Sequence, residues 1–203
     1  GSATINKSNS NLYNPSTPYA LSHSSVETYL RLMNKQYKFP VIISRFANFY
    51  GPYQRLYRVV PLAIHKAFLK EKFYLHGGGN SRRSFIYSED FCEGLHKIII
   101  RGKVGEFYHF SSKEYFSIKD LVKKIYSKFN LDPNKYIVNV KDRPGKDKDY
   151  KIIDNETRKK LKWENKIKLD IGIDYVIKWY LKNNKKFNKK DTKFSIKKWN
   201  QIF

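Results

Sequence analysis

The sequence is short of the residues on which several common kinds of protein depend. Its single cysteine, Cys92, excludes a disulfide framework or a cysteine metal site within one chain. Its ten glycines never take the G-x-G-x-x-G spacing that brings a backbone close to a dinucleotide pyrophosphate. Three consecutive glycines stand at 77–79, but no Gly-Lys-Ser/Thr string follows them, so a P-loop is excluded as well.

Long hydrophobic runs are missing too. No apolar stretch approaches the roughly 18 residues that a membrane-spanning helix needs. The first residues also lack a positively charged stretch followed by a hydrophobic core, which is the pattern of a secretory signal. We therefore expect a soluble, cytoplasmic protein without a membrane partner.

Acidic residues are scarce. There are 18 Asp and Glu against 41 Lys and Arg, which gives a formal net charge of +23. Such an excess indicates an anionic partner, which could be nucleic acid, membrane or a phosphorylated small molecule. Most of the excess is lysine spread over the whole chain, whereas a nucleic-acid footprint is usually a clustered stripe. We therefore favour a basic, solvated surface over a nucleic-acid partner.

What the sequence does contain suffices for a packed core, because 40% of its residues are hydrophobic and 16% are aromatic. A length of 203 residues suits one ordinary domain, or one domain with a short appendage. Residues 1–14 are rich in Ser and Asn and predict a flexible arm. The folded part is expected over 15–183, and the lysine-rich residues 184–203 are typical of a solvated basic tail.

Helices and strands alternate along the predicted folded part, which is typical of the α/β class. Ser16-Thr17-Pro18 offers a cap followed by a proline at the first helical position. Helices are predicted from this point through Met33, over 59–70, from residue 88, and over 117–129, 155–161 and 170–181. Strands are predicted over 40–46, 73–75, 85–87, 106–110 and 136–140.

The strand predicted at 40–46 is almost wholly apolar, which suits burial on both faces of a parallel sheet. A turn is predicted directly after it, at 48–52. Because ligands of open α/β sheets bind at the carboxyl ends of strands, we expect a binding site at this turn.

Tyr19 and His23 are four residues apart on the first predicted helix, so their side chains share a face. A tyrosine phenol, with an ordinary pKa near 10, is a poor base unless a nearby cation stabilises the phenolate. By itself the pair also fits an ordinary helix surface.

Four further motifs accompany this pair in an order that resembles the extended short-chain dehydrogenases, the NAD-dependent epimerases and dehydratases of nucleotide sugars. The resemblance covers about residues 15 to 183 and rests on the strings at 16–23, 45–54, 77–79 with 83–90, 105–108 and 142–147. Within the family the sequence is most similar to the dTDP-glucose 4,6-dehydratases, because the Arg-Pro-Gly-x-Asp string at 143–147 precedes Tyr150.

The resemblance implies that Tyr19 takes a proton from a sugar hydroxyl while hydride passes to a nicotinamide. His23 stands where the family has a lysine, and an ordinary histidine is mostly neutral at pH 7. This departure predicts weakened or absent oxidation chemistry. Phe49 is implied on the cofactor side of the site, together with Tyr19 and His23.

For the nucleotide sugar, the resemblance implies contacts from Asn48, Arg58, Arg83, Arg143 and Asp147. Arginine suits this task because its planar fork binds phosphate oxygens in a bidentate manner. His109 is a departure, since the family usually offers an asparagine to phosphate in that segment.

The implied fold is the C-terminal part of a Rossmann-like parallel sheet plus a small α/β domain that binds a nucleotide sugar. NAD is the implied cofactor of the full-length family, and a nucleotide-diphosphate sugar is the implied partner. A homodimer is also compatible with the resemblance. The family's Thr-Asp-Glu dehydration residues would fall before residue 1. We therefore expect that this stretch alone is not a complete dehydratase, and the sequence leaves open whether NAD binds to it.

Two other hypotheses stay open. The charge of +23 and the lysine-rich tail also fit a non-catalytic protein, derived from a decayed enzyme, that binds nucleic acid or other anions. A sheet without its first strands has an unpaired edge, which favours a role in assembly.

Overall fold

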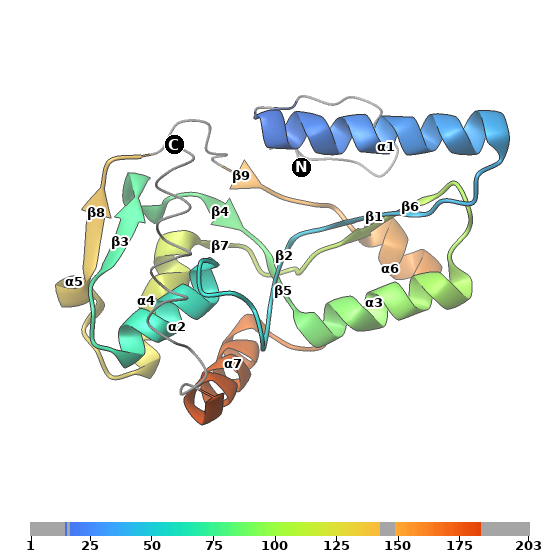
Figure 1. Ribbon diagram of the computed structural model, residues 1–203. Coiled ribbons are helices and arrows are strands. Elements are labelled where there is room, and N and C mark those ends of the chain that lie inside the picture. Colours follow the sequence, from blue (N-terminus) through green and yellow to red (C-terminus); the bar gives the residue numbers. More distant parts are fainter. Residues whose placement is uncertain (1–14, 16, 143–148, 184–203) are drawn as a thin grey trace. The chain divides into compact units, whose positions relative to one another are not determined.

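A computed structural model of the protein describes residues 15, 17–142 and 149–183 (Figure 1). The chain has the α/β architecture that the alternating pattern predicts, with parallel strand pairs. It divides into two compact units. The first comprises residues 1–49, 81–115 and 144–168, and the second comprises residues 50–80, 116–143 and 169–203.

The centre of the first unit is a parallel pair of strands, β1 (Ile43–Phe46) and β6 (Phe107–Phe110), in which Ile43 lies opposite Phe107 and Phe46 opposite Phe110. A second parallel pair joins two short strands, β4 and β9. The other elements of this unit and the bounds of the short strands are α1 (Pro18–Tyr37), β4 (Arg82–Arg83), β5 (Phe85–Tyr87), α3 (Ser88–Arg101), β9 (Asp149–Tyr150) and α6 (Asn155–Leu161).

Trp163 and Phe110 lie at the core of the first unit. Both are fully buried, and their rings meet edge to face with centroids 5.0 Å apart. Burying a side chain such as that of Phe110 stabilises a fold by about 1.5–3 kcal/mol. The remaining buried members of this core are Ala47, Ile86, Ile98, Tyr108 and Leu161.

The first helix, α1, begins where the sequence predicts. Thr17 caps it, because its Oγ1 accepts a hydrogen bond from the backbone N–H of Ala20 at 3.1 Å, and Pro18 occupies the first position. The helix ends at Tyr37, and the capping residue Lys38 that follows takes the left-handed conformation. Of the apolar side chains whose spacing predicts this helix, Leu30 and Met33 are partly buried, whereas 68% of Tyr19 and 61% of Tyr29 are accessible to solvent.

Two predictions about the strand at 40–46 are wrong. The strand starts only at Ile43 and is half-buried, ending in an exposed Phe46, because β6 is its only strand partner within the described residues. The turn predicted to begin at Asn48 is instead a short strand, β2 (Asn48–Tyr50). The backbone stays extended because the N–H of Ala47 donates to the Phe110 carbonyl at 2.9 Å, and the turn comes later, at 52–53.

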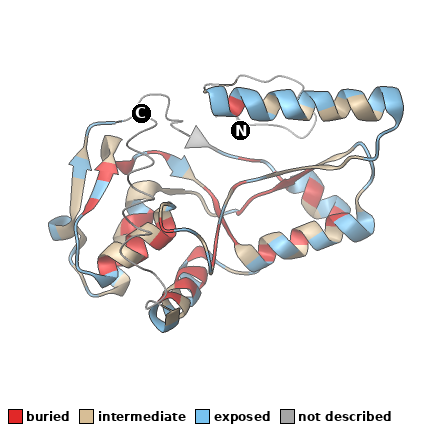
Figure 2. Cartoon of the chain, viewed as in Figure 1, coloured by how far each residue is buried: buried red, intermediate tan, exposed pale blue. Residues whose placement is uncertain are grey.

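The second unit also contains a parallel pair, β3 (Phe73–His76) with β8 (Ile137–Val140). Its helix α2 packs against α4 and α7, and buried residues line these helices (Figure 2). The bounds of the other elements are α2 (Val59–Phe68), η1 (Gly77–Gly79), β7 (Phe116–Ser117), α4 (Ile118–Lys128), α5 (Pro133–Tyr136) and α7 (Leu169–Asn183).

Two tyrosines anchor the second unit from within. Tyr126 donates its hydroxyl to the carbonyl of Glu71 at 2.7 Å, and burial raises its pKa above the ordinary range. Tyr180 donates to Nδ1 of His65, and burial raises the pKa of this phenol to about 12. Burial also lowers the pKa of His65, so its imidazole is neutral and accepts this bond.

In the part of the chain that the structure describes, no helix is both long enough and apolar enough to cross a bilayer.

Candidate functional site

Tyr19 and His23 lie side by side on the first turns of α1, as their spacing predicts. Their ring centroids are 4.4 Å apart and the ring planes are inclined by 53°. Both side chains are exposed, so the pair presents a phenol and an imidazole to solvent. This arrangement can serve proton transfer, and the catalytic roles of the two residues remain predictions.

Asn48 is the first residue of β2 and carries a buried amide. Its Nδ2 atom is shielded from solvent and has no hydrogen-bond partner among the described residues. Most buried polar groups in folded proteins are paired, and leaving a donor unpaired costs about 1–3 kcal/mol. An oxygen of a ligand would satisfy this donor, which makes Asn48 a candidate binding residue.

Phe49 follows Asn48 and belongs to a small aromatic cluster. Its ring stacks on that of Phe91 with an interplanar angle of 8° and a centroid distance of 5.4 Å. The centroid of the Phe46 ring lies 5.5 Å from that of Phe49. Phe49 is 40% exposed, so the cluster offers a partly exposed apolar surface on β2.

The predicted arginines belong to different parts of the chain. Arg83 lies on β4 in the first unit, to which Tyr19 and Asn48 also belong. Arg58 lies in the second unit, where it precedes the first residue of α2 and its guanidinium stands 5.2 Å from the ring centroid of Tyr57. Arg143 and Asp147 lie outside the described residues. The convergence of these side chains on one ligand therefore stays a prediction.

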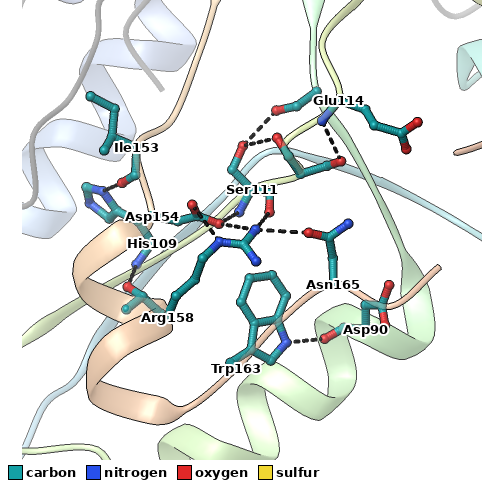
Figure 3. A network of polar contacts seen from close by, with 12 residues as sticks. Asp90, His109, Ser111, Glu114, Ile153, Asp154, Arg158, Trp163 and Asn165 are labelled. Carbon is teal, nitrogen blue, oxygen red and sulfur yellow. Dashed lines mark hydrogen bonds and ion pairs between the residues drawn. The ribbon is translucent and has the colours of Figure 1, made fainter. Parts of the chain in front are cut away.

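A buried polar network in the first unit was not predicted (Figure 3). The carboxylate of Asp154 accepts hydrogen bonds from the backbone N–H of Ser111 and from Nε of Arg158, both at 3.0 Å. Arg158 also donates to the carbonyl of Ser111 at 2.8 Å and to Asn165 at 2.9 Å. Its guanidinium stands 4.9 Å from the ring of Trp163. Because these groups satisfy one another's hydrogen-bonding capacity, the network stabilises the fold and is not a ligand-binding site.

One signal of this network was present in the sequence. Asp154 and Arg158 are four residues apart at the start of a predicted helix, which is the spacing of a helical ion pair. Their shared partner Ser111 lies more than forty residues earlier, and no local pattern connects them.

His109 belongs to the same region and is not a surface residue. It is 1% exposed, and its Nδ1 donates to the carbonyl of Ile153 at 3.1 Å. Its Nε2 lies 3.3 Å from Nη1 of Arg45, and a guanidinium can only donate, so Nε2 accepts. Burial, with a contribution from Arg45, lowers the pKa of His109 and favours this neutral form. These contacts are internal to the fold, so His109 does not take over the phosphate contact of the family's asparagine.

The glycine string at 77–79 does not form a phosphate cradle. All three glycines have positive φ, and a carboxylate fills the space beside the first of them. A Cβ atom placed on Gly77 would lie 2.2 Å from Oδ2 of Asp142. A negative side chain at this position disfavours a bound phosphate.

No group of three or more His, Cys, Asp or Glu within the described ranges is arranged to hold a metal ion.

The α/β class, the parallel strand pairs and the Tyr-x-x-x-His helix agree with the resemblance to short-chain dehydrogenases. The protein belongs to the NAD dependent epimerase/dehydratase family, whose model matches residues 2–111, more than half of its length. The matched stretch contains Tyr19, His23, Asn48, Arg58 and Arg83.

Individual relatives agree with this assignment. The dTDP-glucose 4,6-dehydratase of Escherichia coli is 32% identical over 178 residues, which are 84% of this chain and 49% of that protein. The dTDP-D-glucose 4,6-dehydratase of Mus musculus is 31% identical over 174 residues, which are 83% of this chain and 49% of that protein. The chain therefore spans about half the length of these two relatives.

A solved structure gives the same result. The dTDP-glucose 4,6-dehydratase from Bacillus anthracis, in complex with NAD, aligns with a TM-score of 0.84 and 28% identity. The alignment covers 91% of this chain and 58% of that one. The Rossmann-like α/β fold and the resemblance to nucleotide-sugar dehydratases that the sequence predicts are confirmed.

Proposed function

We propose that this chain is the nucleotide-sugar-binding part of an NAD-dependent 4,6-dehydratase. The observation that carries the proposal is the similarity to dTDP-glucose 4,6-dehydratases over more than four-fifths of the chain. The family match also contains Asn48, Arg58 and Arg83, three of the residues to which we assign the substrate. The unpaired Nδ2 of Asn48 supports the same proposal, because a sugar or phosphate oxygen would satisfy it.

In this proposal the substrate is a nucleoside diphosphate sugar, and arginines neutralise its diphosphate. Arg83 and Arg58 would each donate to phosphate oxygens, and Asn48 would donate its buried amide to the substrate. Arg143 and Asp147 would contact the nucleoside. The net charge of +23 helps to attract such a ligand from solution.

Tyr19 would hold and release the proton of a sugar hydroxyl, with His23 beside it in place of the family's lysine. An imidazole whose ordinary pKa is about 6.5 is mostly neutral at pH 7, so it stabilises a neighbouring phenolate less than an ammonium group does. We therefore propose that the chain keeps the ability to bind the nucleotide sugar more fully than the ability to support oxidation of the sugar hydroxyl.

The residues described here do not fit the whole of NAD. Across residues 15, 17–142 and 149–183, no glycine-rich turn between a strand and a helix presents backbone N–H groups to a pyrophosphate, and Asp142 fills the space beside Gly77. We accordingly assign no step of the chemistry through NAD to this chain. Its own contribution is to bind the sugar nucleotide and to place Tyr19 and His23.

Isothermal titration tests the proposal. We expect heat of binding with dTDP or UDP, and none with thymidine or uridine, because the arginines recognise the diphosphate. Absence of heat with either nucleotide at ligand concentrations of about 1 mM would count against a retained site.

The basic character of the chain suggests a second candidate, a protein that binds nucleic acid through its lysines. It predicts duplex binding that falls steeply with salt and is largely lost when residues 184–203 are deleted. A duplex affinity that does not change with salt concentration would contradict this candidate function. The homodimer and the assembly role remain predictions, and light scattering that shows a clean monomer would contradict both.

A further inference from the structure

Polar side chains, rather than apolar burial, attach helix α1 to the strands of the first unit. Of its twenty residues, all of which the structure describes, Ala20 alone is buried. Glu27 pairs with Arg45 of β1, and the guanidinium of Arg31 stands 5.2 Å from the ring of Phe107 on β6. These polar contacts therefore contribute to the orientation of the helix.

Arg45 makes the most extensive of these contacts. Its Nε donates to Oε2 of Glu27 at 3.0 Å, and its Nη2 pairs with Oε1 of the same carboxylate. Both side chains are 14% exposed, so this two-point ion pair is largely shielded from solvent. The remaining side of the guanidinium reaches inward, where Nη1 donates to Nε2 of His109 at 3.3 Å.

His109 offers this acceptor only in its neutral form. Its Nδ1 already carries the proton that it donates to Ile153, so a second proton would have to occupy Nε2, which faces the Arg45 donor. The backbone N–H of His109 also donates to Thr157 at 2.7 Å, so the residue is held at both its backbone and its ring. A protonated imidazole would therefore meet a positive guanidinium at close range and could not turn away.

The spacing along α1 connects this contact to the candidate site. Tyr19, His23 and Glu27 follow one another at intervals of four residues, which places them along one side of a helix. Fixing Glu27 fixes the rotation of α1 about its own axis. It also fixes the direction in which Tyr19 and His23 point.

We propose that Arg45 is a positioning residue, held between Glu27 and the neutral imidazole of His109, that sets the rotation of α1 and releases it when His109 becomes protonated. The role in orienting Tyr19 rests on the proposed function. The attachment of α1 and its dependence on pH do not.

Charged groups from each neighbouring element bear on His109. Arg45 on β1 disfavours its protonation, as burial does, whereas Glu27 on α1 and Asp154 at the start of α6 favour it. Arg158 of α6 is paired with Asp154 and moderates the effect of that carboxylate. The net result is a pKa below the ordinary value of 6.5, so the release of α1 is expected only below that pH.

Amide hydrogen exchange detected by mass spectrometry tests the proposal on the full chain. Peptides covering α1 are compared at about pH 7.5 and about pH 5, after correction for intrinsic exchange, with α4 as the internal reference because it contains no histidine. We expect the corrected exchange of α1 to rise about tenfold at the lower pH, since a charge-assisted contact is lost. Exchange of α4 should change far less.

Three variants make the test specific. His109→Gln keeps an uncharged acceptor for Arg45 and should abolish the pH dependence of α1, while Arg45→Met should raise α1 exchange at both pH values. His96→Gln, at an exposed histidine on α3 of the same unit, should leave the wild-type behaviour unchanged. If His109→Gln fails to fold, as judged by circular dichroism, His109→Asn provides the same comparison.

Two results would overturn the proposal: α1 exchange in the wild type that does not depend on pH, or pH dependence that persists in both His109 variants. Titration with dTDP is performed on the same samples. A chain that binds no nucleotide but shows the expected exchange would contradict the proposed function and leave the attachment of α1 standing.

Discussion

Trp163 donates its indole N–H to the backbone carbonyl of Asp90 at 2.9 Å, and the two residues are separated by more than seventy positions in the sequence. The side chain of Asp90 completes this junction, because its two carboxylate oxygens accept the backbone N–H groups of Lys166 and Ile167 at 3.1 and 2.9 Å. The segment after α6 is thereby fixed to the first turn of α3. This junction joins the end of the first unit to its core.

We expect Trp163→Phe to destabilise the first unit by about 2–4 kcal/mol, because it leaves a cavity and removes the indole hydrogen bond to the Asp90 carbonyl. Urea denaturation followed by circular dichroism measures this loss. Trp179→Phe is the matched control, since Trp179 is only partly buried and packs against the exposed ring of Tyr53. Equal losses in the two variants would contradict the importance of the Asp90 junction.

Gly94 allows α3 to approach β6 closely. A Cβ atom at this position would lie 2.5 Å from a ring carbon of Phe110, which is fully buried and has no room to move. Although alanine is the better helix former, we expect Gly94→Ala to lower stability by about 1–3 kcal/mol through overpacking. Cys92→Ala, at an exposed position of the same helix, should change stability by less than about 0.5 kcal/mol.

The onset of the main helices could be predicted from the sequence because the signals are local. Thr17 and Pro18 specify the start of α1, and Ser117 caps α4 by accepting the N–H of Asp120 at 3.0 Å. The neighbouring rings of Tyr19 and His23 follow from helical spacing alone.

What could not be predicted depends on partners that are distant in the sequence. The short strands β4, β7 and β9 contain two residues each, too few for any periodicity to be recognised. The strand at Asn48 depends on the pairing of Ala47 with Phe110, and Asn-containing segments before Gly-Pro favour turns when considered alone. Because His109 replaces the asparagine expected by resemblance, only its buried contacts with Arg45 and Ile153 reveal its role.

Stability should decrease as the pH falls below about 6.5, because the buried His109 and the half-buried His65 are neutral in the fold. Burial lowers the pKa of both His109 and His65 below the ordinary value of 6.5. Their contribution is fully present above about pH 6.5 and is lost as the pH falls through their folded-state values, because the unfolded chain then binds more protons. Urea midpoints measured from about pH 7.5 to about pH 4.5 should show this decrease.

The controls for this prediction are histidine variants. His109→Gln and His65→Gln should each flatten the dependence of the midpoint on pH, although each also lowers stability through lost contacts. His96→Gln should leave the slope unchanged, because this side chain is exposed. A slope that survives in the double variant of His109 and His65 would assign the acid sensitivity to carboxylates instead.

Asn48 offers a test that separates binding from folding. Its Nδ2 has no partner in the described part of the chain, so Asn48→Ala removes an unsatisfied donor and should leave the free energy of unfolding unchanged or slightly higher. If the amide donates to the substrate, the same variant should weaken dTDP binding about tenfold. Asn80→Ala, at an exposed asparagine, is the control for both measurements. A fall of more than about 1 kcal/mol in stability with unchanged dTDP affinity would instead show that the Asn48 side chain serves the fold alone.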